Sequence, residues 1–207
     1  MLPRNLPFDA ILFDVGGVLL TNGWDHEERA TVLAQFQLDR AEFEARHPAP
    51  FNLWERDAIS MQAYLDATVF YEPRSFTPDE FFAAICAQSM VQPDGALGIL
   101  QELSASTEYM LGFLNNEPRE PNDYRFKTWG LRELVDVSLS SCYLGLRKPE
   151  PAMYRRAIDI VGGGPDRILF IDDRAGNVAG AAGAGMKTIQ FQNADALRSA
   201  LQSYGVL

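Results

Sequence analysis

Short apolar runs alternate with amphipathic segments from residue 94 to the end of the chain, and this alternation constrains the fold more than any other feature. One further apolar run, residues 8–13, ends at Asp14 and is followed by Gly16-Gly17. Repeated β-then-α units build parallel sheets with helices on both faces. The pattern therefore predicts an α/β fold, with strands at 8–13, 108–113, 135–139, 168–171 and 188–191 and helices at 94–104, 124–134, 152–161, 177–184 and 194–204.

The segment between residues 24 and 90 has a different character, because it contains amphipathic stretches and no convincing strand. Thr77-Pro78-Asp79-Glu80 marks one helix start, with a cap residue, proline at the first helical position and acid in the first turn. We therefore expect a core of residues 1–20 and 91–207 and a small all-helical cap of residues 21–90. Helical periodicity occurs at 27–36, 40–46, 61–70 and 77–88.

Charge and cysteine spacing argue against several classes of protein. The net charge of −10 is unlike that of a generic nucleic-acid binder, which concentrates Lys and Arg. No run reaches the roughly 18 apolar residues that span a bilayer, and residues 1–7 show no charged region leading into an apolar segment, so we expect a protein that is not exported. Cys86 and Cys142 fit neither a disulfide framework nor a zinc site. We expect a cytoplasmic protein that binds neither nucleic acid nor membranes, with His26 and His47 on its surface.

Carboxylates follow two of the expected strands. Asp14 ends the first, and Asp172-Asp173 end another. Ligands of parallel sheets bind beyond the carboxyl ends of the strands, and adjacent carboxylates repel one another unless a cation lies between them. Such hard oxygen ligands suit Mg²⁺. The residues alone leave an alternative open, in which Asp14 caps a turn and Asp173 caps the next helix.

Two further polar segments are expected near the same edge of the sheet. Lys148 precedes a helix that Pro149 or Pro151 would open, and a fixed ammonium offsets the charge of a carboxylate nucleophile that faces an anionic substrate. Asn115-Asn116 follows another expected strand. Without the other motifs, Lys148 would be interpreted as a solvated surface residue.

These motifs resemble those of the haloacid dehalogenase superfamily over nearly the whole chain. The first motif resembles residues 13–19, the third residues 141–149 and the fourth residues 170–173, while residues 54–60 are similar to a cap segment of its phosphatase-like subgroup. The resemblance implies a Rossmann-like core with a helical cap. It also implies that Asp14 attacks phosphorus with help from Lys148, and that Mg²⁺ is held by Asp14, the Gly16 carbonyl, Asp173 and, directly or through water, Asp172.

Two residues depart from the family pattern. Most phosphatases of the family have a second Asp, which acts as general acid and base, where this chain has Gly16; that help is typically worth ~10²–10⁴ in rate. The Ser or Thr of the second motif is replaced by Leu114, or by Asn115 if the register shifts by one. Asn115 and Asn116 remain able to meet the phosphate, and Gly16, Leu114, Asn115 and Asn116 are the expected substrate-binding residues. Three functions therefore stay open: a modest phosphatase, a weakened phosphate or metabolite binder, and a dehalogenase-like hydrolase acting at carbon.

The substrate is expected between the cap and the strand ends, because closure of a cap excludes water from the reaction. A compact cap favours a small phosphorylated metabolite over a macromolecule, by analogy with the family. Glu55, Arg56 and Asp57 are the candidates for choosing the substrate. The chain is expected to be a monomer or a homodimer.

Overall fold

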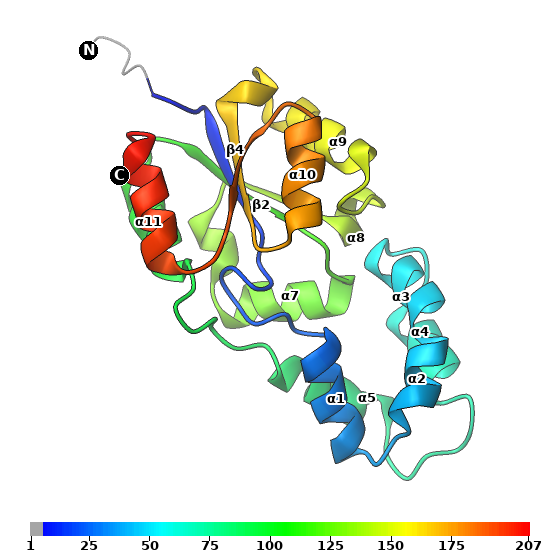
Figure 1. Ribbon diagram of the computed structural model, residues 1–207. Coiled ribbons are helices and arrows are strands. Elements are labelled where there is room, and N and C mark those ends of the chain that lie inside the picture. The colour runs from blue at the N-terminus through cyan, green and yellow to red at the C-terminus, as the bar shows by residue number, and fades with distance from the viewer. Residues whose placement is uncertain (1–5) are drawn as a thin grey trace.

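Five parallel strands form one sheet in the order β3-β2-β1-β4-β5 (Figure 1). The computed structural model describes residues 6–207. The central strand β1 pairs with β2 on one side and with β4 on the other, which places Leu12 between Gly112 and Phe170. The strands are β1 Ala10–Phe13, β2 Met110–Asn115, β3 Val137–Ser140, β4 Ile168–Asp172 and β5 Lys187–Gln190.

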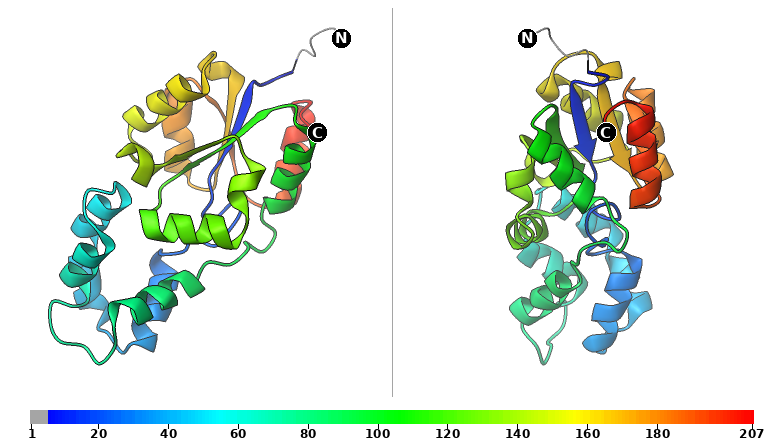
Figure 2. Two further views of the ribbon diagram at one scale, coloured as in Figure 1. Left: turned by 180° about the vertical axis from the view of Figure 1, so that it is seen from behind. Right: turned by 90° about the vertical axis from the view of Figure 1, so that its left-hand side faces the viewer.

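Both faces of the sheet are buried, as the continuous apolar runs predict (Figure 2). Ile11 and Phe13 point to one face, where they join the apolar side chains of α6, α7 and α11. Leu12 points to the opposite face and joins those of α9 and α10. The helices are α6 Leu97–Ser106, α7 Arg119–Thr128, α9 Pro151–Val161, α10 Ala175–Gly183 and α11 Ala194–Ser203. The α/β fold with a fully parallel sheet is therefore confirmed.

Five further helices lie beyond the carboxyl ends of the strands and surround an apolar cluster of their own (Figure 1). Trp54, Tyr64 and Phe81 are fully buried in this cluster. The helix start at Thr77 has the expected capping box, since Thr77 and Glu80 bond to one another's backbone N–H groups. We call these helices the cap: α1 His26–Gln35, α2 Arg40–Arg46, α3 Pro48–Glu55, α4 Met61–Thr68 and α5 Pro78–Ala87.

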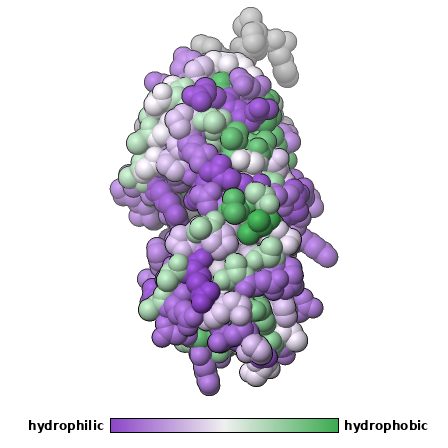
Figure 3. Space-filling model, turned by 90° about the vertical axis from the view of Figure 1, so that its right-hand side faces the viewer, coloured by the Kyte–Doolittle hydropathy of each residue, from purple (hydrophilic) through white to green (hydrophobic). Residues whose placement is uncertain are grey.

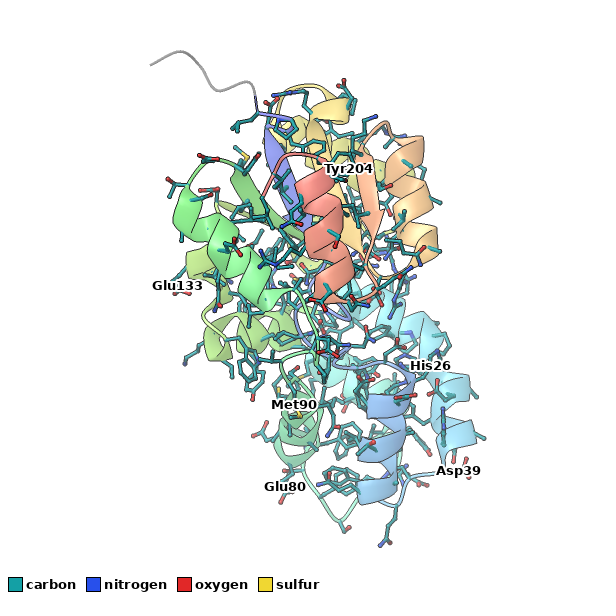
Figure 4. The ribbon with its side chains drawn as sticks, turned by 60° about the vertical axis from the view of Figure 1, so that its left-hand side comes forward. His26, Asp39, Glu80, Met90, Glu133 and Tyr204 are labelled. Carbon is teal, nitrogen blue, oxygen red and sulfur yellow. The ribbon has the colours of Figure 1, made fainter. Side chains whose placement is uncertain are left out.

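The structure corrects two interpretations of the cap. Helix α3 was absent from the expected elements, although Pro48 occupies its first turn, where proline is well tolerated. The expectation that His47 lies on the surface is wrong: its side chain is buried, and Nδ1 lies 2.8 Å from the Tyr64 hydroxyl. His26 is exposed as expected, on the outside of α1 (Figure 4).

Helix positions differ from the expectation mainly after β2. A single helix was expected at residues 124–134, but α7 ends at Thr128, and a 3₁₀ turn, η1 Leu131–Leu134, follows Gly130. Gly130 adopts a φ of +59°, a left-handed conformation that ends a helix at little cost. Two short elements, α8 Ser141–Leu144 and η2 Pro165–Arg167, complete the chain. Across residues 6–207, the structure contains no helix with the length and apolar character needed to cross a membrane.

Candidate active site

Asp14, Lys148 and Asp172 form a buried group at the carboxyl end of the sheet. The N–H of Asp14 donates to the carbonyl of Ile171, which holds the end of β1 against β4. Lys148 Nζ lies 3.0 Å from Asp14 Oδ2 and 2.6 Å from Asp172 Oδ2. Lys148 is 1% exposed and Asp172 fully buried, so the ammonium has little access to water. The two strand ends and Lys148 thus form one charged unit, as the sequence predicts.

Burial and mutual attraction shift the ionisation of this group in opposing directions. Burial raises the pKa of Asp14 to about 7, and Lys148 opposes the shift. Burial alone would lower the pKa of Lys148, but the carboxylates of Asp14 and Asp172 raise it, and the net shift is upward. Lys148 is therefore a permanent cation. Its charge favours the ionised form of Asp14, the form that acts as a nucleophile.

Asp172 and Asp173 differ in how their oxygens are used. Asp172 accepts hydrogen bonds from Lys148, from the Asn177 amide at 3.0 Å and from the Arg174 N–H at 2.8 Å. Asp173 Oδ1 is buried, and no group in the described chain, residues 6–207, donates to it. Burial, followed by the charge of Asp172, raises the Asp173 pKa. Asp173 is thus the one of these two carboxylates with a buried oxygen that accepts no hydrogen bond from residues 6–207.

The carboxylates can hold one small cation. Oxygens of Asp14, Asp172 and Asp173 lie within 4.8 Å of one another, the one such group found among residues 6–207. A set of carboxylate oxygens suits Mg²⁺, which binds one or two carboxylates and keeps several waters. Asp173, with its unpartnered oxygen, and Asp14 are the natural direct ligands. Asp172, already hydrogen-bonded on both oxygens, is better placed to orient Lys148 and Asn177.

The glycines after Asp14 bring the backbone close to these carboxylates. Gly17 has a φ of +73°, and a side chain at this position would collide with the Asp173 carboxylate. Gly16 lines the cavity described below, so its carbonyl remains a candidate metal ligand. A Cβ at Gly16 would meet Asn22 at 3.4 Å, an ordinary contact. The site therefore requires glycine at 17, whereas it leaves space for a side chain at 16.

The residues at the end of β2 do not all face the site. The Leu114 side chain is fully buried in the apolar cluster beneath α9, which corrects its assignment as a substrate-binding residue. Asn115 is buried too, bonded to the Asn122 amide and the Ser140 hydroxyl. Asn116 lines the cavity, and its amide bonds to the backbone N–H and carbonyl of Lys148. Asn116 is therefore the amide that can both position Lys148 and meet a substrate.

A cavity lies between these residues and the cap. Its empty space, including the part open to solvent, is about 630 Å³. The face on the side of α3 and α9 mixes hydrophilic and hydrophobic residues, with a hydrophobic patch near the middle of the view (Figure 3). The core contributes Asp14, Gly16, Asn116, Glu117, Arg147, Lys148, Arg174 and Asn177, and the cap with the segment leading into α1 contributes Asn22, Trp24, Asp25, Arg29, Phe51 and Glu55.

Glu55 is the cap carboxyl most enclosed by this cavity. It is 5% exposed, and its Oε2 lies 2.9 Å from Nη2 of Arg147. The two groups lack an aligned hydrogen bond: among residues 6–207, Glu55 Oε2 accepts none, and Arg147 Nε donates none. Burial raises the pKa of Glu55 to about 7 against the opposing charge of Arg147. Glu55 can therefore exchange a proton near neutral pH.

The other two cap candidates bind to the core outside the cavity. Arg56 forms an ion pair with Glu150, and Asp57 forms one with Arg119 at 2.6 Å. Next to them, the Nε1–H group of Trp54 donates a hydrogen bond to the Glu120 carboxylate at 2.9 Å. These contacts join α3 and the turn after it to the core. Arg56 and Asp57 thus fix the cap in place, and of the three candidates only Glu55 lines the cavity.

Sequence reasoning missed three arginines that line the cavity. Arg147 directly precedes Lys148, and Arg174 directly follows Asp173. Their positions next to predicted site residues could have identified both arginines as candidates. Arg174 also binds Asp25 of the cap at 2.7 Å. Arg29 lies on α1, is 4% exposed and bonds to Glu44 at 3.0 Å. Nothing in the sequence near Arg29 distinguishes it from a surface helix residue, because its ion-pair partner Glu44 lies on a different helix, α2.

Comparisons with known proteins show what the chain is similar to. A family model described as haloacid dehalogenase-like hydrolase matches residues 8–185. The chain is similar to flavin mononucleotide hydrolase 1 of Arabidopsis thaliana, a chloroplast protein, with 28% identity over 98% of this chain and 79% of that protein. It is also similar to validoxylamine A 7'-phosphate phosphatase of Streptomyces hygroscopicus, with 23% identity over 86% of this chain and 83% of the other.

A solved structure supports the fold independently. A HAD family enzyme of Bacteroides thetaiotaomicron, in complex with magnesium and inorganic phosphate, superposes with a TM-score of 0.72. The match has 21% sequence identity and covers 90% of this chain and 95% of the other. At this identity the likeness establishes the shared fold, and the chemistry has to be argued from the residues of the site.

Proposed function

Because the chain belongs to the haloacid dehalogenase-like hydrolases, we propose that it is a Mg²⁺-dependent phosphatase that cleaves phosphate monoesters of small metabolites. One observation carries the proposal. Lys148 Nζ lies 3.0 Å from the Asp14 carboxylate, while Asp173 beside them has a buried oxygen that accepts no hydrogen bond from residues 6–207. A nucleophile oriented by a cation, next to a set of hard oxygen ligands, suits phosphoryl transfer.

In the proposed mechanism, Asp14 is the nucleophile, and the other residues of the site stabilise charge or orient the reacting groups. The Asp14 oxygen attacks phosphorus and forms an aspartyl-phosphate, and water then cleaves it. Lys148 favours the ionised form of Asp14 and attracts the anionic phosphoryl group. Asn116 presents an amide at the same cavity, and Asn177 orients Asp172. Mg²⁺, held by Asp14, Asp173 and the Gly16 carbonyl, would supply charge neutralisation at the phosphoryl oxygens.

The domain division supports a small substrate. We propose that residues 1–20 and 91–207 form the core that carries the chemistry and that residues 21–90 form the cap that covers it. Ion pairs between Arg174 and Asp25 and between Arg147 and Glu55 join the two parts at the rim of the cavity. A substrate therefore has to fit between them, which favours a phosphorylated metabolite over a macromolecule.

Two alternatives make different predictions from the same site. A phosphate binder with little turnover is favoured by Gly16, which supplies no proton, and by the burial of the Leu114 side chain. A hydrolase acting at carbon would use the same Asp14 but would not need a cation at Asp173. If the protein is a hydrolase acting at carbon, it should turn over its substrate without metal. If it is a phosphate binder, it should show no turnover with or without metal.

The test is a substrate panel with and without Mg²⁺. Aryl, sugar and nucleotide monophosphates are compared with a 2-haloalkanoic acid, in buffer containing Mg²⁺ or a chelator. We expect phosphate release only with Mg²⁺, and no halide release in either buffer. Halide release in the chelator would replace the proposal by the carbon-acting hydrolase. Tight phosphate binding without turnover on any ester would favour the binder.

A further inference from the structure

The proposed reaction needs a proton donor that the core does not contain at the expected position. In phosphoryl transfer the attacking and leaving oxygens lie roughly in line with phosphorus. Asp14 attacks from the ends of the strands, so the leaving oxygen points toward the cap. Gly16, two residues after the nucleophile, has no side chain to protonate that oxygen. A donor has to come from another part of the cavity wall.

The carboxyls that line the cavity can be compared by what they bind. Asp25 bonds to Arg174 at 2.7 Å and is 30% exposed. Glu117 is held by the buried Arg125, which leaves its carboxylate committed to a structural ion pair. Glu55 is 5% exposed and has a buried oxygen that accepts no hydrogen bond from residues 6–207. Among these three, Glu55 alone has a buried oxygen available for a proton or a ligand.

Glu55 also lies on the required side of the site. It is the last residue of α3, the cap helix that contacts α8 of the core. It pairs with Arg147, the residue directly before Lys148. The charge of Lys148, whose ammonium contacts Asp14, acts on the Glu55 carboxyl. Glu55 and the nucleophile therefore face the same small volume from the cap and from the core.

We propose that Glu55 supplies from the cap the general acid and base that Gly16 cannot provide, which rests on the phosphatase function proposed above. The Asp14 oxygen bonds to phosphorus as the bond to the leaving oxygen breaks, and that oxygen takes the proton of the Glu55 carboxyl. Water then attacks phosphorus and gives its proton to the Glu55 carboxylate. The bond from Asp14 to phosphorus breaks, phosphate leaves, and both carboxyl groups return to their starting states.

The charges around Glu55 suit this role. Burial raises its pKa to about 7, with a smaller upward effect from Glu117, against the downward effects of Arg147, Arg174 and Lys148. A donor works best when its pKa lies near the working pH. The carboxyl thus carries a proton before the first step and accepts one in the second. The nearby Arg147 stabilises the carboxylate that forms between the two steps.

The experiment compares Glu55→Gln with the wild type on two leaving groups, in saturating Mg²⁺. An alkyl phosphate leaves as a basic alkoxide that needs a proton, whereas p-nitrophenyl phosphate leaves as a stable phenolate. We expect kcat to fall by about 10²-fold for the alkyl ester and by less than about threefold for the aryl ester, given the usual size of acid catalysis. Glu55→Asp, which keeps a carboxyl, should recover part of the loss.

The pH profile provides a second readout that a structural role would not change. For the alkyl ester, kcat/KM of the wild type should decline above about pH 7, where Glu55 loses its proton. Glu55→Gln should remove this decline and keep the rise at lower pH. The matched control is Glu72→Gln, the same change at an exposed cap residue that pairs with Arg74 outside the cavity; its kinetics should equal those of the wild type.

The outcomes separate this inference from the proposed function. Equal losses on both esters, or no loss, would overturn the role of Glu55 while leaving the phosphatase function intact. An unchanged decline at high pH in Glu55→Gln would do the same. Failure of the wild type to hydrolyse either ester would overturn both proposals.

Discussion

Lys148 Nζ lies 3.0 Å from the Oδ2 atom of Asp14, and the structure buries both side chains at the carboxyl end of the central strand. The same ammonium lies 2.6 Å from Asp172. One cation thus compensates two carboxylates from neighbouring strands. This arrangement explains why β1 and β4 can each end in a charge inside a largely apolar core, and it makes a stability prediction as well as a catalytic one.

Replacement of Lys148 by Met should reduce both turnover and stability. The variant leaves the buried Asp172 without its cation, and breaking a buried pair in this way typically costs about 3–5 kcal/mol. Turnover should fall by at least about 10²-fold, because the nucleophile loses its positive partner. Urea unfolding and phosphate release measure the two effects. A free energy of unfolding equal to that of the wild type would contradict the buried charged unit.

Replacement of Asp173 by Asn should separate metal binding from folding. The metal-free variant should be as stable as the wild type or more stable, because it loses a buried charge that Asp172 repels. Addition of Mg²⁺ should raise the melting temperature of the wild type and have little effect on the variant, since a ligand stabilises only the state that binds it. Equal Mg²⁺-induced shifts in both proteins would place the metal elsewhere.

Replacement of Gly16 by Asp should add a proton donor from the core. The backbone leaves room for a side chain at this position, and Gly16→Asp is expected to raise turnover on alkyl esters, which need protonation. The same change should rescue Glu55→Gln on those esters, because the two carboxyls would perform one task. The measurement is steady-state kcat on alkyl esters for the two single variants and the double variant. A double variant as slow as Glu55→Gln would argue against a missing acid.

Acid should weaken the cap through His47. Burial lowers the pKa of this imidazole to about 4, with a further contribution from Arg29. The unfolded chain takes up a proton near the ordinary value of 6.5, so the stability that depends on neutral His47 is present above that pH. It declines as the pH falls toward 4, by on the order of 2–3 kcal/mol.

The measurement for His47 is urea unfolding at about pH 7.5 and at about pH 5, where linkage predicts different stabilities. His47→Gln keeps a polar partner for Tyr64 and has no proton to gain. The variant should therefore lose less stability than the wild type between the two pH values. Identical losses would assign the acid sensitivity to other groups, such as the buried carboxylates that Lys148 compensates.

The sequence predicts the parallel sheet well because its signals are local. Apolar runs that end in Asp14 and Asp172 identify both strands and the functional edge of the sheet at once. The helix expected at residues 124–134 is wrong in position, because the preference of Gly130 for a left-handed turn outweighs the amphipathic pattern. Helix α3 was not predicted because its two prolines weaken the helical signal of the sequence. The packing of Trp54 in the cap cluster stabilises the helix.

The sequence predicts only those site residues that belong to short sequence motifs. Asp14, Lys148, Asp172 and Asp173 follow from motifs, and the structure brings them together. The burial of His47 depends on how α3 packs against the other cap helices, and the ion pair between Glu55 and Arg147 depends on how α3 packs against the core. Glu55 and Arg147 lie more than 90 positions apart in the sequence, and His47 is a polar residue inside the apolar cluster of the cap. No local sequence pattern indicates either contact.

The central claim is that Asp14 attacks phosphorus, and the most direct test is Mg²⁺-dependent phosphate release by wild type and Asp14→Asn. Circular dichroism and thermal unfolding establish that the variant is folded, and Asn fits the same space. We predict measurable release by the wild type with Mg²⁺, none with a chelator, and none by the folded Asp14→Asn variant. Undiminished release by that variant would contradict the account, because the nucleophile would then have to be another group.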